Sequence, residues 1–579
     1  MKKIKIILVL LIGVCSLTFL SCDDLLEEKS YDFAGLDTFE DSDRSAQLYV
    51  NGVLGVLNSN RFLGSPSYMK GQELDTDYCT AGTWAMGGLG AGNFSGDGYV
   101  TDIWNGRYEL IYRCNFALNL LQKMNNLDPE MKNNYMGQLY FLRGWALYQV
   151  VRFFGPCPVY DKLADTPDEF NRPRESVEKV YERIIEDLKM ASDYMFPKTD
   201  SRYEVGRISK YAAKTLLAEV YTFMASASMP EGTIVKVSGG PARELVGDEL
   251  VRKSLPIVFD HAKKKVAGYE VFDSKKCYEE VRTLCQDIIK NGGYDLFENY
   301  MDTWSYANRN GKEFIWQIQA SSPLLTNSIN NDWAGAYWSP RGSNFMVGRL
   351  YGLRDHWYEL SEDKDLRVRE GVLHRFCTGI WTWGWGIEHR IGHEEWYFYP
   401  LKDSVYVNNQ TMGYKNLIGE GGKPYPEYWG GTFATLEKFA AVEDRTKEFS
   451  AYHYPVLRYP VVYLMLAEAE NELNNPMEAS KAIDVLRNRA KATTISDKTL
   501  MNKDDLRAYI IAERARELAL EGYRRVDLLR WGVYVDVMNK IDIDEHTILK
   551  RRQDRHVLMP IPQDELAANK AITENNPGW

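Results

Sequence analysis

The sequence lacks the features that mark several functional classes. It has no basic block, and its 70 Lys and Arg are outnumbered by 81 Asp and Glu (net charge −11), which argues against nucleic-acid binding. There is no Cys-x-x-Cys pair to indicate a zinc knuckle or a thioredoxin-like site. Neither a Gly-x-Ser-x-Gly elbow nor a His-Glu-x-x-His motif occurs. After residue 21, no run of 18 apolar residues could span a membrane.

What is abundant is aromatic residues. The chain has 579 residues, of which 45% are hydrophobic and 26% charged, an ordinary globular composition for a chain long enough to bury a large core. Aromatic residues make up 13% and include 15 Trp and 37 Tyr. Ten of the 15 Trp lie between Trp304 and Trp429, so the aromatic excess is local.

The first 21 residues form a predicted lipoprotein signal peptide. Lys2, Lys3 and Lys5 precede an apolar run over 6–20 that is short for a membrane span. Residues 17–22 (LTFLSC) resemble a bacterial lipobox, which predicts cleavage before Cys22 and its acylation. The alternative is a plain secretory leader cleaved nearby. Removal of residues 1–21 leaves 67 basic and 81 acidic residues, which is a net charge of −14. Six other Cys would then remain, whose pairing the sequence leaves open.

Two helix-rich regions flank an irregular middle. Apolar residues recur at helical spacing in six segments, which predict helices near 139–153, 176–195, 209–223, 460–469, 479–490 and 504–521. Short turns with Gly or Pro separate them, so we expect stacked helical hairpins of tetratricopeptide type. In the middle, about 295–455, helical periodicity is poor, and residues 314–319 alternate like a strand.

Several segments, taken together and in order, resemble one family. They are residues 139–148 (LYFLRGWALY), 154–159 (FGPCPV), 206–213 (GRISKYAA), 457–469 (LRYPVVYLMLAEA), 510–531 (IIAERARELALEGYRRVDLLRW), 558–562 (LMPIP) and 576–579 (NPGW). This order is similar to that of the SusD/RagB outer-membrane nutrient-binding lipoproteins of Bacteroidetes. The family often ends in Asn-Pro-Gly-Tyr, whereas this chain ends in Trp579.

The resemblance implies a mostly α fold, in which a tetratricopeptide-type helical scaffold carries an irregular, loop-rich ligand-binding region with short strands. It divides the chain into a signal peptide (1–21), an N-terminal helical region (22–230), a loop-rich aromatic region (231–455) and a C-terminal helical region (456–579). It also implies a lipid-anchored, surface-exposed outer-membrane protein that sits as a lid on a TonB-dependent SusC-like transporter. Neither catalysis nor a cofactor is expected.

Three functions remain as hypotheses. The first is capture of an oligo- or polysaccharide and its delivery to the transporter. The second is binding of peptides or other non-sugar nutrients on the same fold. The third is a secreted glycoside hydrolase, because Glu513, Glu517 and Glu521 repeat at a spacing of four residues along a helix, and paired carboxylates do acid–base work in such enzymes. Against the third, we expect these residues to form a scaffold ion network with Arg487, Arg489, Arg514 or Arg524.

A metal site is not predicted. His389 and His393 have the i, i+4 spacing of shared ligands, but nearby glycines weaken the helix that this spacing requires. We therefore expect a structural or surface role for the two histidines.

The candidate ligand-binding residues mix rings with polar side chains in loop-like settings. Indole and phenol rings match the apolar face of a sugar, while amide, carboxylate and guanidinium groups bond its hydroxyls. The alternative is that many of these rings belong to the core. The candidates are Trp84, Asn93, Asp97, Asn331, Asp332, Trp333, Tyr337, Trp338, Arg341 and Trp383.

Overall fold

A computed structural model describes most of the chain from residue 41 to residue 579. The gaps in this description are 64–66, 82–85, 165, 242, 247–248, 253–256, 321–328, 331–350, 378–395, 400–403, 408–409, 414–421, 425–432, 440–448, 451–452, 496–501 and 545–546.

The fold is mostly α-helical, as predicted. The helices are α2 (Asp43–Gly55), α3 (Ser67–Glu73), α5 (Gly98–Lys123), α6 (Pro129–Phe154), α7 (Val177–Tyr194), α8 (Lys210–Ala227), α9 (Ser274–Asn291), α11 (Asp355–Tyr358), α12 (Leu366–Arg369), α14 (Tyr459–Glu472), α15 (Pro476–Arg489), α16 (Lys503–Glu517), α17 (Arg524–Arg530), α18 (Tyr534–Ile541) and α19 (Gln563–Ala568).

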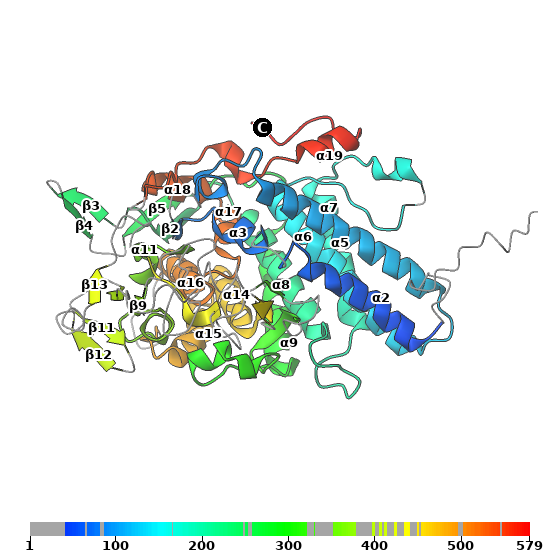
Figure 1. The fold of residues 1–579 in the computed structure, drawn as a ribbon, viewed down its shortest axis with the longest axis horizontal. Helices are drawn as coiled ribbons and strands as arrows, with labels where there is room; N and C mark the ends of the chain where they lie inside the picture. Colours follow the sequence, from blue (N-terminus) through cyan, green and yellow to red (C-terminus); the bar gives the residue numbers. More distant parts are fainter. Residues whose placement is uncertain are drawn as a thin grey trace, which may run out of the picture.

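The long helices pack in a continuous series. Helix α5 packs on α6, α6 on α7, α7 on α8 and α8 on α9, and α9 then packs on α14, which contacts α15 and α16. The chain leaves the series after α9 and returns to it at α14 (Figure 1). The two helix-rich regions therefore form one scaffold, joined by α9, a helix that the sequence analysis did not predict.

Local signals set the predicted helix ends. The hydroxyl of Ser176 accepts a hydrogen bond from the N–H of Lys179, and that of Ser209 from the N–H of Ala212, so both serines are N-caps. Helix α6 stops at Gly155, where φ is +69° and an added Cβ would lie 2.9 Å from Cδ1 of Leu558.

The helix predicted to reach residue 521 is shorter than expected. Helix α16 ends at Glu517, and the chain turns through two left-handed residues, Leu520 (φ +58°) and Gly522 (φ +85°). Glu521 therefore lies in this turn rather than on the helix, although it stays beside the same basic side chains.

Aromatic packing joins the N-terminal helices to the middle of the chain. The ring of Trp316 meets those of Phe141 and Trp145 edge to face, with centroids 4.9 and 5.2 Å away. Trp145 and Tyr148 in α6, Tyr211 in α8 and Trp531 after α17 are all buried and pack the scaffold.

The strands are short and pair over long sequence distances. They are β1 (Cys79–Ala81), β2 (Ile234–Ser238), β3 (Arg243–Val246), β4 (Glu249–Arg252), β5 (Val258–Ala262), β6 (Phe314–Ile318), β7 (Ile329–Asn330), β8 (Tyr351–Leu353), β9 (Arg375–Cys377), β10 (Trp396–Phe398), β11 (Ser404–Val407), β12 (Gln410–Gly413), β13 (Gly422–Pro424), β14 (Phe449–Ser450) and β15 (Tyr454–Arg458). Antiparallel pairs are β1–β8, β2–β5, β3–β4, β6–β15, β7–β14, β9–β10 and β11–β12, while β13 runs parallel to β10. The predicted strand at 314–319 corresponds to β6.

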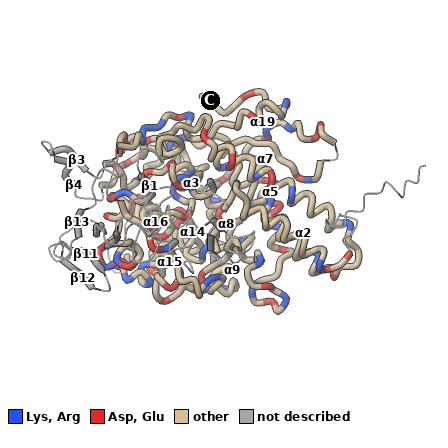
Figure 2. Tube along the Cα trace, viewed as in Figure 1, with Lys and Arg blue, Asp and Glu red and all other residues tan. Residues whose placement is uncertain are grey.

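Charges of both signs are interspersed along the described trace (Figure 2). Among the residues that the structure describes, no helix is both long and apolar enough to cross a membrane. Cys79, Cys114, Cys157, Cys277 and Cys285 are buried free thiols.

Candidate functional site

A two-stranded ribbon brings together the ends of two segments that carry predicted ligand residues. Strands β1 and β8 are antiparallel, and Ala81 pairs with Tyr351 at one end. Residues 82–85, which include Trp84, follow Ala81 directly, and residues 331–350 directly precede Tyr351. Two candidate segments that are far apart in the sequence are therefore connected to the same end of one ribbon.

The ribbon is held from the C-terminal side by buried polar contacts. Lys550 Nζ donates to the carbonyl oxygens of Thr76 and Cys79, at 3.0 and 2.7 Å, and is itself buried. The hydroxyl of Thr80 donates to Asp544 Oδ2 at 3.0 Å. Because burying these groups unpaired would be costly, the contacts fix the position of residues 76–80 against the C-terminal region.

The turn before α5 is held by the same C-terminal region. Arg552 pairs with the buried Asp75 at 2.9 Å, and its Nη2 donates to the carbonyl of Gly90 at 2.7 Å. An added Cβ on Gly92, whose φ is +84°, would lie 3.1 Å from Nη1 of Arg552. The left-handed backbone conformation and the close approach of Arg552 both favour glycine at this position.

Two predicted ligand residues, Asn93 and Asp97, lie in and after this turn. Asn93 is exposed, and its Nδ2 donates to the carbonyl of Gly87 at 2.6 Å. Asp97 caps α5: its Oδ1 accepts from the N–H of Tyr99 and its Oδ2 from the N–H of Leu89, both at 2.9 Å. Partial burial raises the pKa of Asp97 and outweighs the lowering effect of these two donors. Asp97 thus has a structural task, and its carboxylate keeps lone pairs for a further donor.

A cavity of about 220 Å³ lies beside Asp97 and is also lined by Trp579. The Trp579 ring stacks on Phe94 at 5.7 Å, and the guanidinium carbon of Arg555 lies 4.6 Å from its centroid. Its indole N–H donates to the carbonyls of Arg555 and Leu558. Trp579 is therefore engaged within the protein and is not a free stacking platform.

The other candidate residues lie outside the described part of the chain. These are Cys22, Trp84, Asn331, Asp332, Trp333, Tyr337, Trp338, Arg341 and Trp383, together with His389 and His393. Trp383 belongs to the segment that connects the paired strands β9 and β10.

Part of the aromatic excess in the middle of the chain is core. Trp304, Trp316 and Trp357 are each no more than 3% exposed. The indole N–H of Trp357 donates to the carbonyl of Ala515 at 2.9 Å, which joins the middle region to α16. These three rings stabilise the fold, so they are not available to a ligand.

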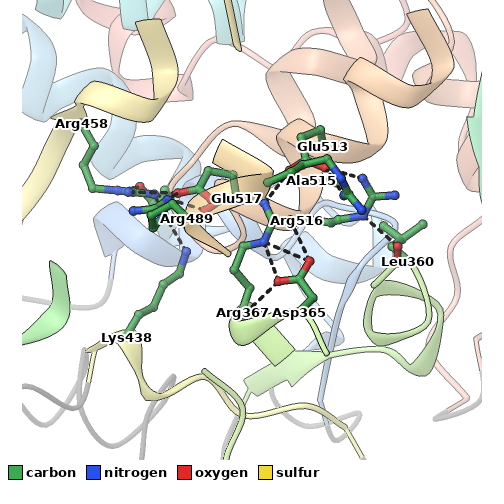
Figure 3. A network of polar contacts seen from close by, with 12 residues as sticks. Leu360, Asp365, Arg367, Lys438, Arg458, Arg489, Glu513, Ala515, Arg516 and Glu517 are labelled. Carbon is green, nitrogen blue, oxygen red and sulfur yellow. Dashed lines mark hydrogen bonds and ion pairs between the residues drawn. The ribbon is translucent and has the colours of Figure 1, made fainter. Parts of the chain in front are cut away.

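The glutamates of α16 form the predicted ion network rather than an exposed acid pair. Glu513 contacts Arg367 and Arg516 at 2.6 and 2.5 Å (Figure 3). It also contacts Arg487 at 3.0 Å. Burial alone would raise the pKa of Glu513, but the three guanidinium groups lower it to about 2. A general acid needs a pKa near the working pH, so Glu513 is unsuited to that role.

Glu517 and Glu521 extend the network. Glu517 meets Arg489 at 2.5 Å and Arg458 at 3.3 Å, and Glu521 meets Arg458 and Lys438, each at 2.7 Å. Neighbouring cations hold the pKa of both glutamates below its usual range against the effect of burial.

Two of the four arginines named as network partners are confirmed, and two were wrong. Arg487 and Arg489 bind the glutamates, whereas Arg514 binds Asp527 and Arg524 binds Asp77. The side chains of Arg514 in α16 and Arg524 in α17 point toward other elements. Residue spacing alone does not reveal this direction.

Unlike the glutamates of the network, Glu73 has a raised pKa. Burial raises the pKa of Glu73 to about 7, although the Gly522 N–H and Lys438 act in the opposite direction. The adjoining cavity measures only about 10 Å³, roughly the space of one water molecule and too small for a sugar. Glu73 is therefore not placed to protonate a glycosidic oxygen.

Within the described ranges, no cluster of three His, Cys, Asp or Glu side chains could hold a metal ion.

A further cavity, of about 310 Å³, was not predicted. Rings of Tyr108, Tyr112, Tyr160 and Phe170 line it, between α5, the chain after α6 and α19. The i, i+4 spacing of Tyr108 and Tyr112 could have indicated a shared helix face, but the other walls come from distant parts of the sequence.

Family models match two parts of the chain. The model described as "SusD family" matches residues 299–579, and the model described as "Starch-binding associating with outer membrane" matches residues 71–222. The chain belongs to the SusD/RagB family. A SusD-like protein of Formosa agariphila is 22% identical, over 96% of this chain and 95% of that protein.

Solved SusD-type structures share the fold. A SusD superfamily protein from Parabacteroides distasonis has a TM-score of 0.66 at 20% identity, over 93% of this chain and 99% of that one. Surface glycan-binding protein A from Bacteroides fluxus has a TM-score of 0.64 at 17% identity, over 93% and 100%. A structure described as "Laminarin binding SusD-like protein" has a TM-score of 0.64 at 18% identity, over 93% and 99%. The SusD-like fold therefore extends over nearly the whole chain.

Proposed function

We propose that this SusD/RagB protein captures an oligo- or polysaccharide at the cell surface and delivers it to a TonB-dependent SusC-like transporter. The observation that carries this proposal is the shared fold over 93% of the chain with proteins named for binding glycan or laminarin. The function is binding without catalysis, since the glutamates of α16 are neutralised by arginines inside the scaffold.

The binding site is formed by the segments at the end of the β1–β8 ribbon. Trp84 follows β1, and Asn331, Asp332, Trp333, Tyr337, Trp338 and Arg341 precede β8, with Asn93 and Asp97 in the adjoining turn and Trp383 between β9 and β10. Most of them fall in region 231–455, which the flanking helical regions 22–230 and 456–579 support. Rings would stack on the C–H faces of sugars, and the polar groups would bond the hydroxyls.

Affinity electrophoresis of the purified protein through gels that contain laminarin, starch or other polysaccharides tests binding. We expect retardation by at least one polysaccharide, and weaker retardation after Trp84→Ala, Trp333→Ala or Trp338→Ala. Loss of a stacking ring should cost more than about 1 kcal/mol of binding free energy, roughly a fivefold loss of affinity. Leu48→Ala, at an exposed position on α2, is the control.

Two results would contradict these assignments. Unchanged affinity in all three tryptophan variants would refute the site. Retention of peptides and of no polysaccharide would replace the glycan with a peptide ligand.

The absence of catalysis is tested on the same polysaccharides. Incubation with the protein should release no shorter saccharides. Product formation that disappears in Glu517→Gln, with the folded state retained, would establish the hydrolase instead.

Lipid attachment at Cys22 anchors the protein to the cell outer membrane, with the binding site outside the cell. We expect the wild type in the membrane fraction and accessible to protease on intact cells, whereas Cys22→Ala should be released. Co-purification with a SusC-like β-barrel transporter tests the partner. Recovery of Cys22→Ala with the membrane, in cells that lack this transporter, would refute the anchor.

A further inference from the structure

The cavity between α5 and α19 is lined by none of the residues of the proposed loop site. Its walls are the middle of α5, the chain at 160–171 and α19. In Figure 1, α5 and α19 lie to the right, whereas β9, β11, β12 and β13 lie at the left edge. A ligand in this cavity would not touch those strands.

Two aromatic side chains of this cavity are unusually exposed. Tyr112 and Phe170 are each 47% exposed, and their ring centroids are 6.5 Å apart at an interplanar angle of 42°. Behind them, Tyr108 and Tyr160 meet edge to face, with centroids 5.8 Å apart. Neighbouring exposed rings at a concave surface leave apolar area in water that a ligand could cover.

The inner rings are fixed before any ligand arrives. The hydroxyl of Tyr108 donates to the carbonyl of Pro158 at 2.9 Å, and that of Tyr160 to the carbonyl of Phe170 at 2.7 Å. Their orientation is thus set by the protein, which lowers the entropy lost on binding.

A buried ion pair supports the same wall. Arg143 in α6 binds Asp187 in α7 at 2.7 Å, and both side chains are buried. Arg143 also donates to Oδ1 of Asn115 at 2.7 Å, while Nδ2 of Asn115 donates to the carbonyls of Tyr160 and Lys162. The scaffold therefore positions the chain at 160–162 against α5 through a continuous hydrogen-bonded path.

The cavity also offers both hydrogen-bond acceptors and hydrogen-bond donors. Oε1 of Glu565 accepts an N–H from Nδ2 of Asn569 at 3.1 Å, and Oε2 accepts the indole N–H of Trp104 at 3.4 Å. Each of the two oxygens keeps a lone pair for another donor. Asn171 accepts the N–H of Lys570 through Oδ1, so its amide N–H groups can donate. Lys162, 3.6 Å from Glu169, is a further donor.

These features discriminate between kinds of ligand. An inserted apolar side chain would cover the rings but would desolvate Glu565 without giving it a donor, which is costly. A polyhydroxylated ring has an apolar C–H face for the rings and hydroxyls that both donate and accept. The volume of about 310 Å³ is at the low end for small-molecule sites, which suits a single sugar unit or a chain end.

We infer that the cavity between α5 and α19 is a second saccharide-binding site, which takes one sugar ring against Tyr112 and Phe170 with its hydroxyls on Glu565 and Asn171. This inference rests on the proposed glycan-binding function and adds a separate point of attachment. A polysaccharide long enough to reach both sites would bind with increased avidity.

A fluorine label at position 170 tests the site directly. Phe170 is replaced by 4-fluorophenylalanine, and the ¹⁹F resonance is followed during titration with methyl glycosides of glucose, galactose, mannose, xylose, N-acetylglucosamine, rhamnose, fucose and glucuronic acid. We expect a saturable shift with at least one glycoside, and at least about tenfold weaker binding in Tyr112→Ala. Leu48→Ala, with 46% exposure on α2, is the matched control and should bind as the wild type does.

The two proposals fail in different ways. The shift should persist in a Trp84→Ala, Trp333→Ala, Trp338→Ala variant, even if that variant no longer binds polysaccharide. No shift with any glycoside, or a shift unaffected by Tyr112→Ala, overturns the second site while leaving the loop site intact. A shift caused by the solubilised transporter and by none of the glycosides would also overturn it, in favour of a protein contact.

Discussion

Glu513→Gln removes one negative charge where three guanidinium groups converge. Arg367, Arg487 and Arg516 lie within 3.0 Å of the Glu513 carboxylate, which is fully buried. Lowering a carboxyl pKa from 4.5 to about 2 corresponds to about 3 kcal/mol of stabilisation at neutral pH. Breaking a buried ion pair by removing one partner costs roughly 3–5 kcal/mol, which agrees in size. We therefore expect Glu513→Gln to lose about 3 kcal/mol of unfolding free energy at pH 7, measured by urea denaturation.

The pH dependence of this loss follows from the direction of the shift. Because folding lowers the pKa of Glu513, its stabilisation is complete above the unfolded value of 4.5 and is lost as pH falls toward 2. The difference between wild type and Glu513→Gln should therefore narrow as pH is lowered from 5 to 3. Glu478→Gln is the control, since Glu478 and Lys481 form an exposed pair worth less than about 1 kcal/mol. A Glu513→Gln loss no larger than that of the control, or one that does not change with pH, would refute the reasoning.

Substitutions at three further positions test other parts of the structure. Folding raises the pKa of Glu73 to about 7. The unfolding free energy of the wild type, measured by urea titration, should therefore fall relative to that of Glu73→Gln by up to about 3 kcal/mol as pH rises from 5 to 8. A difference between the two proteins that does not change with pH would contradict this. An added Cβ on Gly144 would lie 3.3 Å from Leu188 in α7. Gly144→Leu should therefore lower the free energy of unfolding by more than about 2 kcal/mol through overpacking, and Gly144→Ala by clearly less. Equal losses in the two variants would argue against close packing of α6 on α7. Asp97→Ala should cost about 1–2 kcal/mol and speed amide exchange at Leu89 by hydrogen-exchange mass spectrometry, and unchanged exchange would show that the Asp97 contact does not hold the turn.

The candidate site could be predicted in chemistry but only partly in geometry. Rings clustered with amides and carboxylates indicated ligand binding, and pairing of Ala81 with Tyr351 brings together the ends of two such segments. Asp97 was chosen for its carboxylate, yet its position at the start of α5 uses both oxygens on backbone N–H groups. Trp316 and Trp357 belong to the same aromatic excess but are buried. Composition records how many rings a segment has, whereas their exposure depends on which elements pack over them.

The sequence by itself determined six of the helices (α6, α7, α8, α14, α15 and α16) and several of their ends, because those signals act over a few residues. Ser209 caps α8 through a donor three residues away, and Gly155 ends α6 by its own backbone freedom. Only the tertiary structure decided that α9 joins the two helical regions and that Arg367 meets Glu513 across 146 residues. It also decided that Tyr112 and Phe170 share a cavity. Such contacts depend on how distant segments pack together, and no local spacing in the chain encodes them.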